Sequence, residues 1–169
     1  LESIVMANDI CNRFGLDTIS AGTTIAFAIE CYENAIISKK DTEGIELTWG
    51  NSKAIVDTTI KLAKREGFGA VLADGVMRAA DKIGKGAEQY AIHVHGQELP
   101  MHDPRFGPSL ALGYKTDATP ARHLQAIAGL AEGPGMMPYD KYNYDQPGRA
   151  EIYRMVTNLH HVLQASGAC

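Results

Sequence analysis

The chain has 169 residues, of which 45% are apolar and 21% charged, as is typical of a soluble globular protein with one domain or parts of two. Its formal net charge of −4 offers no basic surface for nucleic acid or an anionic membrane, and no apolar run reaches membrane-spanning length without polar interruption. The three cysteines, Cys11, Cys31 and Cys169, are odd in number and widely spaced. They favour a reducing, cytoplasmic location over a disulfide framework.

The first predicted elements are two helices that meet at a corner over residues 12–18. Apolar residues at helical spacing precede Gly15, which can adopt the left-handed conformation that ends a helix. Asp17 or Thr18 then caps a second helix over residues 18–37, which is rich in small and apolar side chains. The corner gathers an amide from Asn12, a carboxylate and unpaired backbone groups. Taken alone, this is ordinary helix capping, although the same chemistry can hold a polar ligand.

The middle of the chain alternates helical and extended patterns. Residues 38–44 read as a charged turn and residues 45–49 alternate like a short strand. Asn51 or Ser52 starts a helix that Gly67 is expected to end. A further helix is predicted over residues 70–83, followed by an extended stretch over residues 90–99.

The last third is predicted to be helical around a long loop. Helical character returns at residues 109–114, and Thr119-Pro120 is a helix start signal. Residues 131–148 form a loop of unusual length, and residues 149–165 an amphipathic helix. The predicted fold class is therefore mainly α, a multi-helical domain with short extended segments.

Residues 8–33, which include the corner, resemble the aldehyde ferredoxin oxidoreductase family, whose pterin-binding signature Asp-x-x-Gly-Leu-Asp/Cys occurs twice. Further short blocks of the chain also resemble the family, in the expected order and at plausible spacings, which is more specific than any one block. They are Arg65–Gly69, Ala73–Val76, Gly86–Glu88, His93–Pro100, Asp103–Arg105, Leu112–Tyr114 and Ala121–Leu124. The resemblance implies a tungsten (or molybdenum) bis-pterin cofactor and a 4Fe–4S cluster. It also implies oxidation of aldehydes to carboxylic acids, ferredoxin as electron acceptor, and a homo-oligomer.

The resemblance places Asn12, Gly15, Leu16, Asp17 and Thr18 at the first pterin. A carboxylate can accept two adjacent N–H groups from the aminopyrimidine edge of a pterin, and glycine lets the backbone approach the ring. Asn12 departs from the signature, which has aspartate there, and the exchange forfeits on the order of 1–3 kcal/mol of binding.

A second, weaker copy of the signature falls at the end of the chain. It places Gln164, Gly167 and Ala168 at the second pterin, with Gln164 in place of aspartate and Ala168 in place of leucine. The resemblance makes Cys169 the fourth ligand of the 4Fe–4S cluster. The other three ligands, a Cys-x-x-Cys-x-x-x-Cys run, are not in this sequence, and one thiolate cannot hold a four-iron cluster.

The resemblance also makes His123 an active-site residue. In the first turn of a helix that starts at Pro120, the helix dipole would keep the imidazole neutral near pH 7 and able to accept a proton. Oxidation of an aldehyde hydrate releases protons, so a neutral base is useful there.

We therefore divide the chain into a helical segment over residues 1–92, with the first pterin motif, and a second over residues 93–169, with His123 and Cys169. The whole is expected to be an excised piece of a longer enzyme and inactive alone. Two alternatives stay open. One is a cofactor-free helical scaffold or interaction module derived from the family, which Asn12, Gln164 and Ala168 favour. The other is a related enzyme for a different carbonyl substrate, such as an acyl thioester reductase.

Overall fold

The structure is a computed structural model that describes residues 1–123 and 147–167. The chain divides into two compact units, residues 1–99 and 100–169, and each is described by itself. Helices dominate, and the described strands form one short antiparallel hairpin, which confirms the predicted mainly α fold. None of the described helices is long and apolar enough to cross a membrane. The predicted loop over residues 131–148 lies outside the described residues, apart from its last two.

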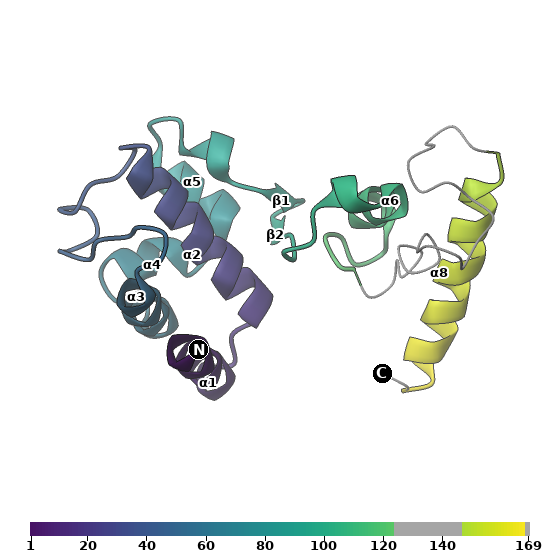
Figure 1. Cartoon of the computed structure of the whole chain (residues 1–169), viewed down its shortest axis with the longest axis horizontal. Coiled ribbons are helices and arrows are strands. Elements are labelled where there is room, and N and C mark those ends of the chain that lie inside the picture. The colour runs from purple at the N-terminus through teal and green to yellow at the C-terminus, as the bar shows by residue number, and fades with distance from the viewer. Residues whose placement is uncertain (124–146, 168–169) are drawn as a thin grey trace. The chain divides into compact units, whose positions relative to one another are not determined.

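The first unit is a helical cluster followed by the hairpin (Figure 1). The hairpin strands pair antiparallel, with His93 opposite Glu98 and Val94 opposite Gln97. The elements of this unit, in chain order, are α1 (Glu2–Phe14), α2 (Thr18–Glu33), α3 (Ser52–Lys64), α4 (Phe68–Leu72), α5 (Val76–Ile83), η1 (Ala87–Tyr90), β1 (His93–Val94) and β2 (Gln97–Glu98).

Helix α2 is the centre of this unit. It contacts all four of the other α-helices of the unit as well as η1 and β2 (Figure 1). Its apolar and small residues are buried on several sides, because helices surround it. Ile29 of α2, Leu47 of the following loop and Leu72 of α4 are among the largest fully buried side chains. The first unit is therefore built around the helix that the corner begins.

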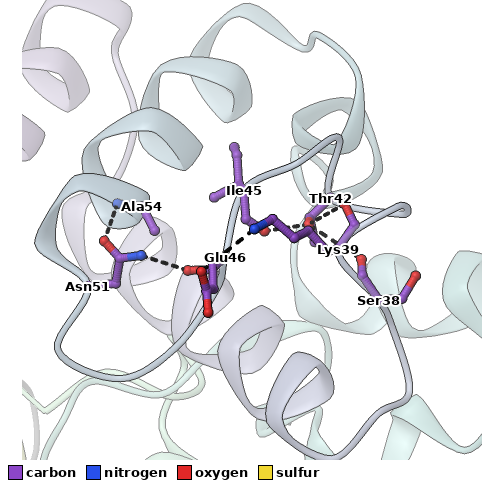
Figure 2. Close-up of polar contacts among 7 residues, drawn as sticks. All are labelled: Ser38, Lys39, Thr42, Ile45, Glu46, Asn51 and Ala54. Carbon is purple, nitrogen blue, oxygen red and sulfur yellow. Dashed lines mark hydrogen bonds and ion pairs between the residues drawn. The ribbon is translucent and has the colours of Figure 1, made fainter.

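The predicted strand over residues 45–49 is wrong. Residues 45–48 form a loop with no strand partner among the described residues, although Leu47 is fully buried. Side chains satisfy the backbone instead, as Figure 2 shows: Thr42 Oγ1 donates to the Ile45 carbonyl at 2.5 Å and Asn51 Nδ2 to the Glu46 carbonyl at 2.8 Å. The alternating apolar pattern of this segment arises because Leu47 is buried in the core, and not because the segment pairs in a sheet.

The predicted single helix over residues 70–83 is also wrong, because α4 and α5 are separate. The chain breaks at Gly75, whose φ of 86° and ψ of 170° are outside the helical region. Two predicted ends shift as well. Helix α2 ends at Glu33 rather than residue 37, and α3 ends at Lys64 with Arg65, not Gly67, in the left-handed conformation at φ 55°.

The second unit contains η2 (Pro104–Phe106), α6 (Pro108–Thr116) and α8 (Arg149–Ala165). The predicted bounds of α8 are confirmed, and Met155 and Leu159 on its apolar face are more than half exposed. The predicted helix start at Thr119-Pro120 is wrong for residues 119–123, where Ala121 has a left-handed φ of 60°.

Candidate functional site

The corner over residues 12–18 has the predicted local structure. Helix α1 ends at Phe14, and Gly15 follows in the left-handed conformation, with φ 69° and ψ 32°. The Leu16 N–H bonds to the Cys11 carbonyl at 2.8 Å. Asp17 is the N-cap of α2, since its Oδ1 accepts the Ser20 N–H at 2.8 Å. A helix end, a left-handed glycine and a capping carboxylate thus meet within seven residues, as the sequence predicted.

A cavity of about 370 Å³ lies beside this corner. Of the five predicted residues of the first motif, Leu16 and Asp17 line it. Asn12 and Thr18 are exposed at the end of α1 and the start of α2. The remaining lining residues come from α2, α3, the break between α4 and α5, and the hairpin: Ser20, Ala21, Thr24, Leu62, Arg65, Leu72, Ala73, Asp74, Gly75, Arg78, Gly96 and Glu98.

The far wall of the cavity carries an ion-pair network centred on Asp74. Arg65 Nη2 lies 2.6 Å from one carboxylate oxygen of Asp74, and Lys82 Nζ lies 2.9 Å from the other. Hydrogen bonds from Arg65 and then Lys82 lower the pKa of Asp74 to about 2. Asp74 is therefore ionised at neutral pH, and the network ties the end of α3 to α5.

Sequence reasoning missed most of this wall. The blocks Arg65–Gly69 and Ala73–Val76 supported the family resemblance, yet Arg65, Asp74 and Arg78 were not predicted as site residues. The predicted continuous helix over residues 70–83 hid the bend that turns this segment toward the corner. The signal in the sequence was the Asp74-Gly75 pair, which is a turn signature inside a helical pattern.

The second motif, like the first, has a glycine of positive φ near the end of a helix. Gln164 lies in the last turn of α8 and is exposed. Gly167 has a left-handed φ of 80°, close to that of Gly15, and its N–H bonds to the Gln164 carbonyl at 3.0 Å. Ala168 and Cys169 lie outside the described residues. Both copies thus place a left-handed glycine at a helix end.

His123 is half-buried, and the predicted helix around it does not start at Pro120, because residues 119–123 are not helical. Residues 124–146, which follow His123, lie outside the described residues. Burial lowers the pKa of His123, and the nearby charges of His102 and Arg122 lower it further. The two histidine rings lie 4.8 Å apart between centroids, at 59°.

Tyr114 of α6 forms hydrogen bonds with the backbone of both segments that carry the histidines, at His102 and at Ala121. Its hydroxyl donates to the His102 carbonyl at 3.1 Å, and its own carbonyl accepts the Ala121 N–H at 2.9 Å. Nδ1 of His123 is buried and has no hydrogen-bond partner among residues 1–123 and 147–167. The lowered pKa keeps this imidazole neutral at pH 7, and the neutral ring can accept a proton from a reacting group.

The structure brings Leu16 and Asp17 together in the first unit, whereas His123, Gln164 and Gly167 belong to the second. A shared hollow for Asp17, His123 and Cys169 stays a prediction. Across residues 1–123 and 147–167, no three His, Cys, Asp or Glu side chains are grouped as metal ligands. Cys11 and Cys31 are buried thiols, and burial raises the pKa of Cys31 to about 11.

The cavity residues fit a pterin by their chemistry. A pterin presents N–H donors beside ring-nitrogen and carbonyl acceptors. The cavity offers the carboxylate of Asp17 as an acceptor and the guanidinium of Arg78 as a donor. A carboxylate oxygen can accept more than one hydrogen bond, so the capping role of Asp17 is compatible with ligand contact.

Comparisons with known proteins point to one family. The family model "Aldehyde ferredoxin oxidoreductase, domains 2 & 3" matches residues 1–169. The tungsten-containing aldehyde ferredoxin oxidoreductases of Pyrococcus horikoshii and Pyrococcus furiosus are 36% and 39% identical to the chain over its whole length. The chain spans 28% of the length of each of these two relatives.

Two further proteins are similar to the chain. The WOR-like subunit of an aliphatic sulfonate oxidoreductase of Pyrococcus furiosus is 39% identical over 62% of this chain and 17% of that protein. In fold, the chain is similar to the active site complex BamBC of benzoyl coenzyme A reductase, with a TM-score of 0.57 and 23% identity over 91% of this chain and 28% of that one. With a family model matched from the first residue to the last, this chain belongs to the aldehyde ferredoxin oxidoreductase family of oxidoreductases.

Proposed function

We propose that this chain is the part of a tungsten (or molybdenum) bis-pterin aldehyde oxidoreductase that binds the pterins. In the full-length protein, an aldehyde and water yield a carboxylic acid, two electrons and two protons, and the electrons pass through a 4Fe–4S cluster to ferredoxin. The observation that carries the proposal is the cavity beside the corner, where Asp17 and the Arg65–Asp74 pair face one polar space. The Pyrococcus relatives described above are named tungsten-containing aldehyde ferredoxin oxidoreductases.

The residues of the chain divide the work. The metal bound to the pterins would supply the two-electron oxidation. Leu16 and Asp17 would hold the first pterin, with the Asp17 carboxylate accepting its N–H donors and Arg78 donating to its acceptors. Gln164, Gly167 and Ala168 would contact the second pterin, and Cys169 would be a cluster ligand. His123, neutral because burial lowers its pKa, would accept a proton released by the substrate.

A cofactor-free scaffold remains the second candidate, favoured by one observation. Asn12, which replaces the first aspartate of the signature, is exposed on α1, and the cavity lining does not include it. Metal analysis of the full-length protein separates the two functions. Tungsten or molybdenum near one equivalent and iron near four per chain support the enzyme, and the absence of both metals supports the scaffold. We propose an aldehyde as the substrate because the tungsten-containing relatives are named for aldehydes. Another relative is named for aliphatic sulfonates.

A substitution at Asp17 tests the pterin site itself. Asp17→Asn keeps an oxygen that can cap α2 but removes the charge that strengthens the hydrogen bonds to the pterin. We expect pterin retained per chain in the purified full-length protein to fall by about tenfold, with little change in melting temperature. Asp57→Asn, at a half-buried aspartate of α3 that pairs with Lys53 and lies outside the cavity lining, is the matched control. A full pterin content in Asp17→Asn would remove the corner from the proposed site.

A further inference from the structure

Glu98 is a buried carboxylate that accepts a hydrogen bond from the start of a helix. Only 4% of the residue is exposed, and its Oε1 accepts the Val76 N–H at 2.8 Å. A buried charge is costly unless it is paired, and a helix N-terminus provides such a partner. The N-cap of α5 is Gly75, which has no side chain to do this. The cap of α5 therefore comes from β2, 22 residues later in the sequence.

The glycine and the carboxylate are fitted to each other. Gly75 has a φ of 86°, and a Cβ built there would lie 2.5 Å from Glu98 Oε1. A side chain at position 75 would thus collide with the group that caps the helix. Only with glycine at this break between α4 and α5 can the carboxylate reach the Val76 N–H.

The same hairpin is attached to α2 on both sides of Glu98. Gln97 Nε2 lies 3.1 Å from Ser20 Oγ, and the Leu99 carbonyl accepts the Thr23 hydroxyl at 2.9 Å. Ser20 and Thr23 lie in the first two turns of α2, the helix that Asp17 caps. Glu98 therefore links the α2 wall of the cavity to the wall that contains Asp74 and Arg78.

We propose that Glu98 is a positioning residue of the pterin site, which holds the first turn of α5, and with it Asp74 and Arg78, at a fixed distance from the Asp17 corner. The inference rests on the proposed function, because it assigns Glu98 a role in the same cavity. Glu98 acts through Val76 and Gly75 and not as a catalytic residue. Its essential feature is an acceptor oxygen at the Val76 N–H rather than a full negative charge.

The test compares two substitutions in the full-length protein, with pterin retained per chain as the readout and melting temperature as a check on folding. Glu98→Gln keeps an acceptor for the Val76 N–H and should retain pterin within about threefold of the unsubstituted protein. Glu98→Ala removes it and should lower retention by about tenfold. Glu88→Ala, at an exposed glutamate of η1, is the matched control and should leave retention unchanged. Equal losses in Glu98→Gln and Glu98→Ala, or no loss in a folded Glu98→Ala, would overturn the positioning role.

A second substitution keeps the proposal open to refutation if Glu98→Ala does not fold. Val76→Pro removes the N–H at the first position of α5 and should lower pterin retention more than Val76→Ala, which shortens the same fully buried side chain but keeps the N–H. When Glu98→Ala and Val76→Pro both fold, their combination should lose little more pterin than Val76→Pro alone, because both remove the same hydrogen bond. If the losses of pterin in the two single variants multiply in the combined variant, the inference is overturned. Loss in Asp17→Asn without loss in either of these variants would overturn the role of Glu98 alone, whereas full retention in Asp17→Asn would count against the proposed function.

Discussion

Gly69 marks the closest approach of α4 to α3, and Gly69→Ala should open this contact. A Cβ built at Gly69 would lie 2.1 Å from the Lys61 carbonyl carbon and 2.5 Å from the Leu62 nitrogen. Carbon atoms normally stay about 3.5–4.0 Å apart, so α4 would have to move by more than about 1 Å. The atoms it meets are backbone, which cannot rotate away as a side chain could.

The magnitude follows from what this contact buries. Phe68 and Leu72, on either side of Gly69 in α4, are 6% and 0% exposed, and burial of each is worth about 1.5–3 kcal/mol. Overpacking of a core typically costs about 1–3 kcal/mol, and partial exposure of these two side chains adds to it. We expect α4 to lose about 3 kcal/mol of local stability, which corresponds to about 100-fold faster amide exchange.

Hydrogen–deuterium exchange of the intact protein measures this directly in peptides that cover α4. Gly50→Ala is the matched control: it also adds one methyl group, at φ 84°, but the new Cβ would meet nothing within 4 Å. Its backbone strain of about 1–2 kcal/mol should remain near residue 50 and leave exchange in α4 unchanged. Unchanged protection of α4 in Gly69→Ala, or equal loss in both variants, would refute the argument that backbone contact sets the spacing of α3 and α4.

Three further predictions concern charge, protonation and a buried hydroxyl. The pKa of Asp74, lowered from 3.8 to about 2, means that its ion pairs stabilise the fold above about pH 4 and that this contribution is lost as the pH falls through about 2. Asp74→Asn should therefore flatten the acid limb of melting temperature against pH, and an unchanged limb would contradict the pairing. Because His102 is one of the groups that lower the pKa of His123, after burial itself, His102→Phe should raise that pKa in an NMR titration of the ring, and no change would exclude an electrostatic role for His102. A lowered histidine pKa also means that the unfolded chain binds more protons, so stability should fall as the pH drops below about 6.5. Thr42→Val preserves the side-chain shape but removes the donor to the Ile45 carbonyl. It should lower the local stability of the 38–51 loop by about 1–3 kcal/mol, measured by amide exchange. Exchange as slow as in the unsubstituted protein would show that this hydrogen bond does not hold the loop.

Local signals were enough for the corner. The conformation of Gly15 and the cap at Asp17 depend on residues no more than four positions away, so the sequence pattern predicted both. The cap at Asn51, whose Oδ1 accepts the Ala54 N–H at 3.2 Å, has the same origin. The family blocks, read in order, likewise indicated the oxidoreductase family before any coordinates were considered.

Distant contacts decided the parts that sequence reasoning misread. The break at Gly75 is stabilised by Glu98 of the hairpin, which lies 22 positions after Val76. The 45–48 loop is the exception, because its bonds from Thr42 and Asn51 span only three and five positions and were nevertheless missed (Figure 2). The pKa of His123 is lowered by burial and by His102, which lies 21 positions earlier.

The sequence by itself therefore determined the mainly α fold, the caps at Gly15, Asp17 and Asn51, and the family, because these depend on neighbouring residues and on short motifs. Only the tertiary structure decided the cavity, since its walls come from α2, α3, the α4–α5 break and the hairpin, which no periodicity joins. A hydrogen bond such as that between Glu98 and Val76 forms only after packing has brought its two ends together. The chemistry of the corner is local, and the space in front of it is made by segments distant in the sequence.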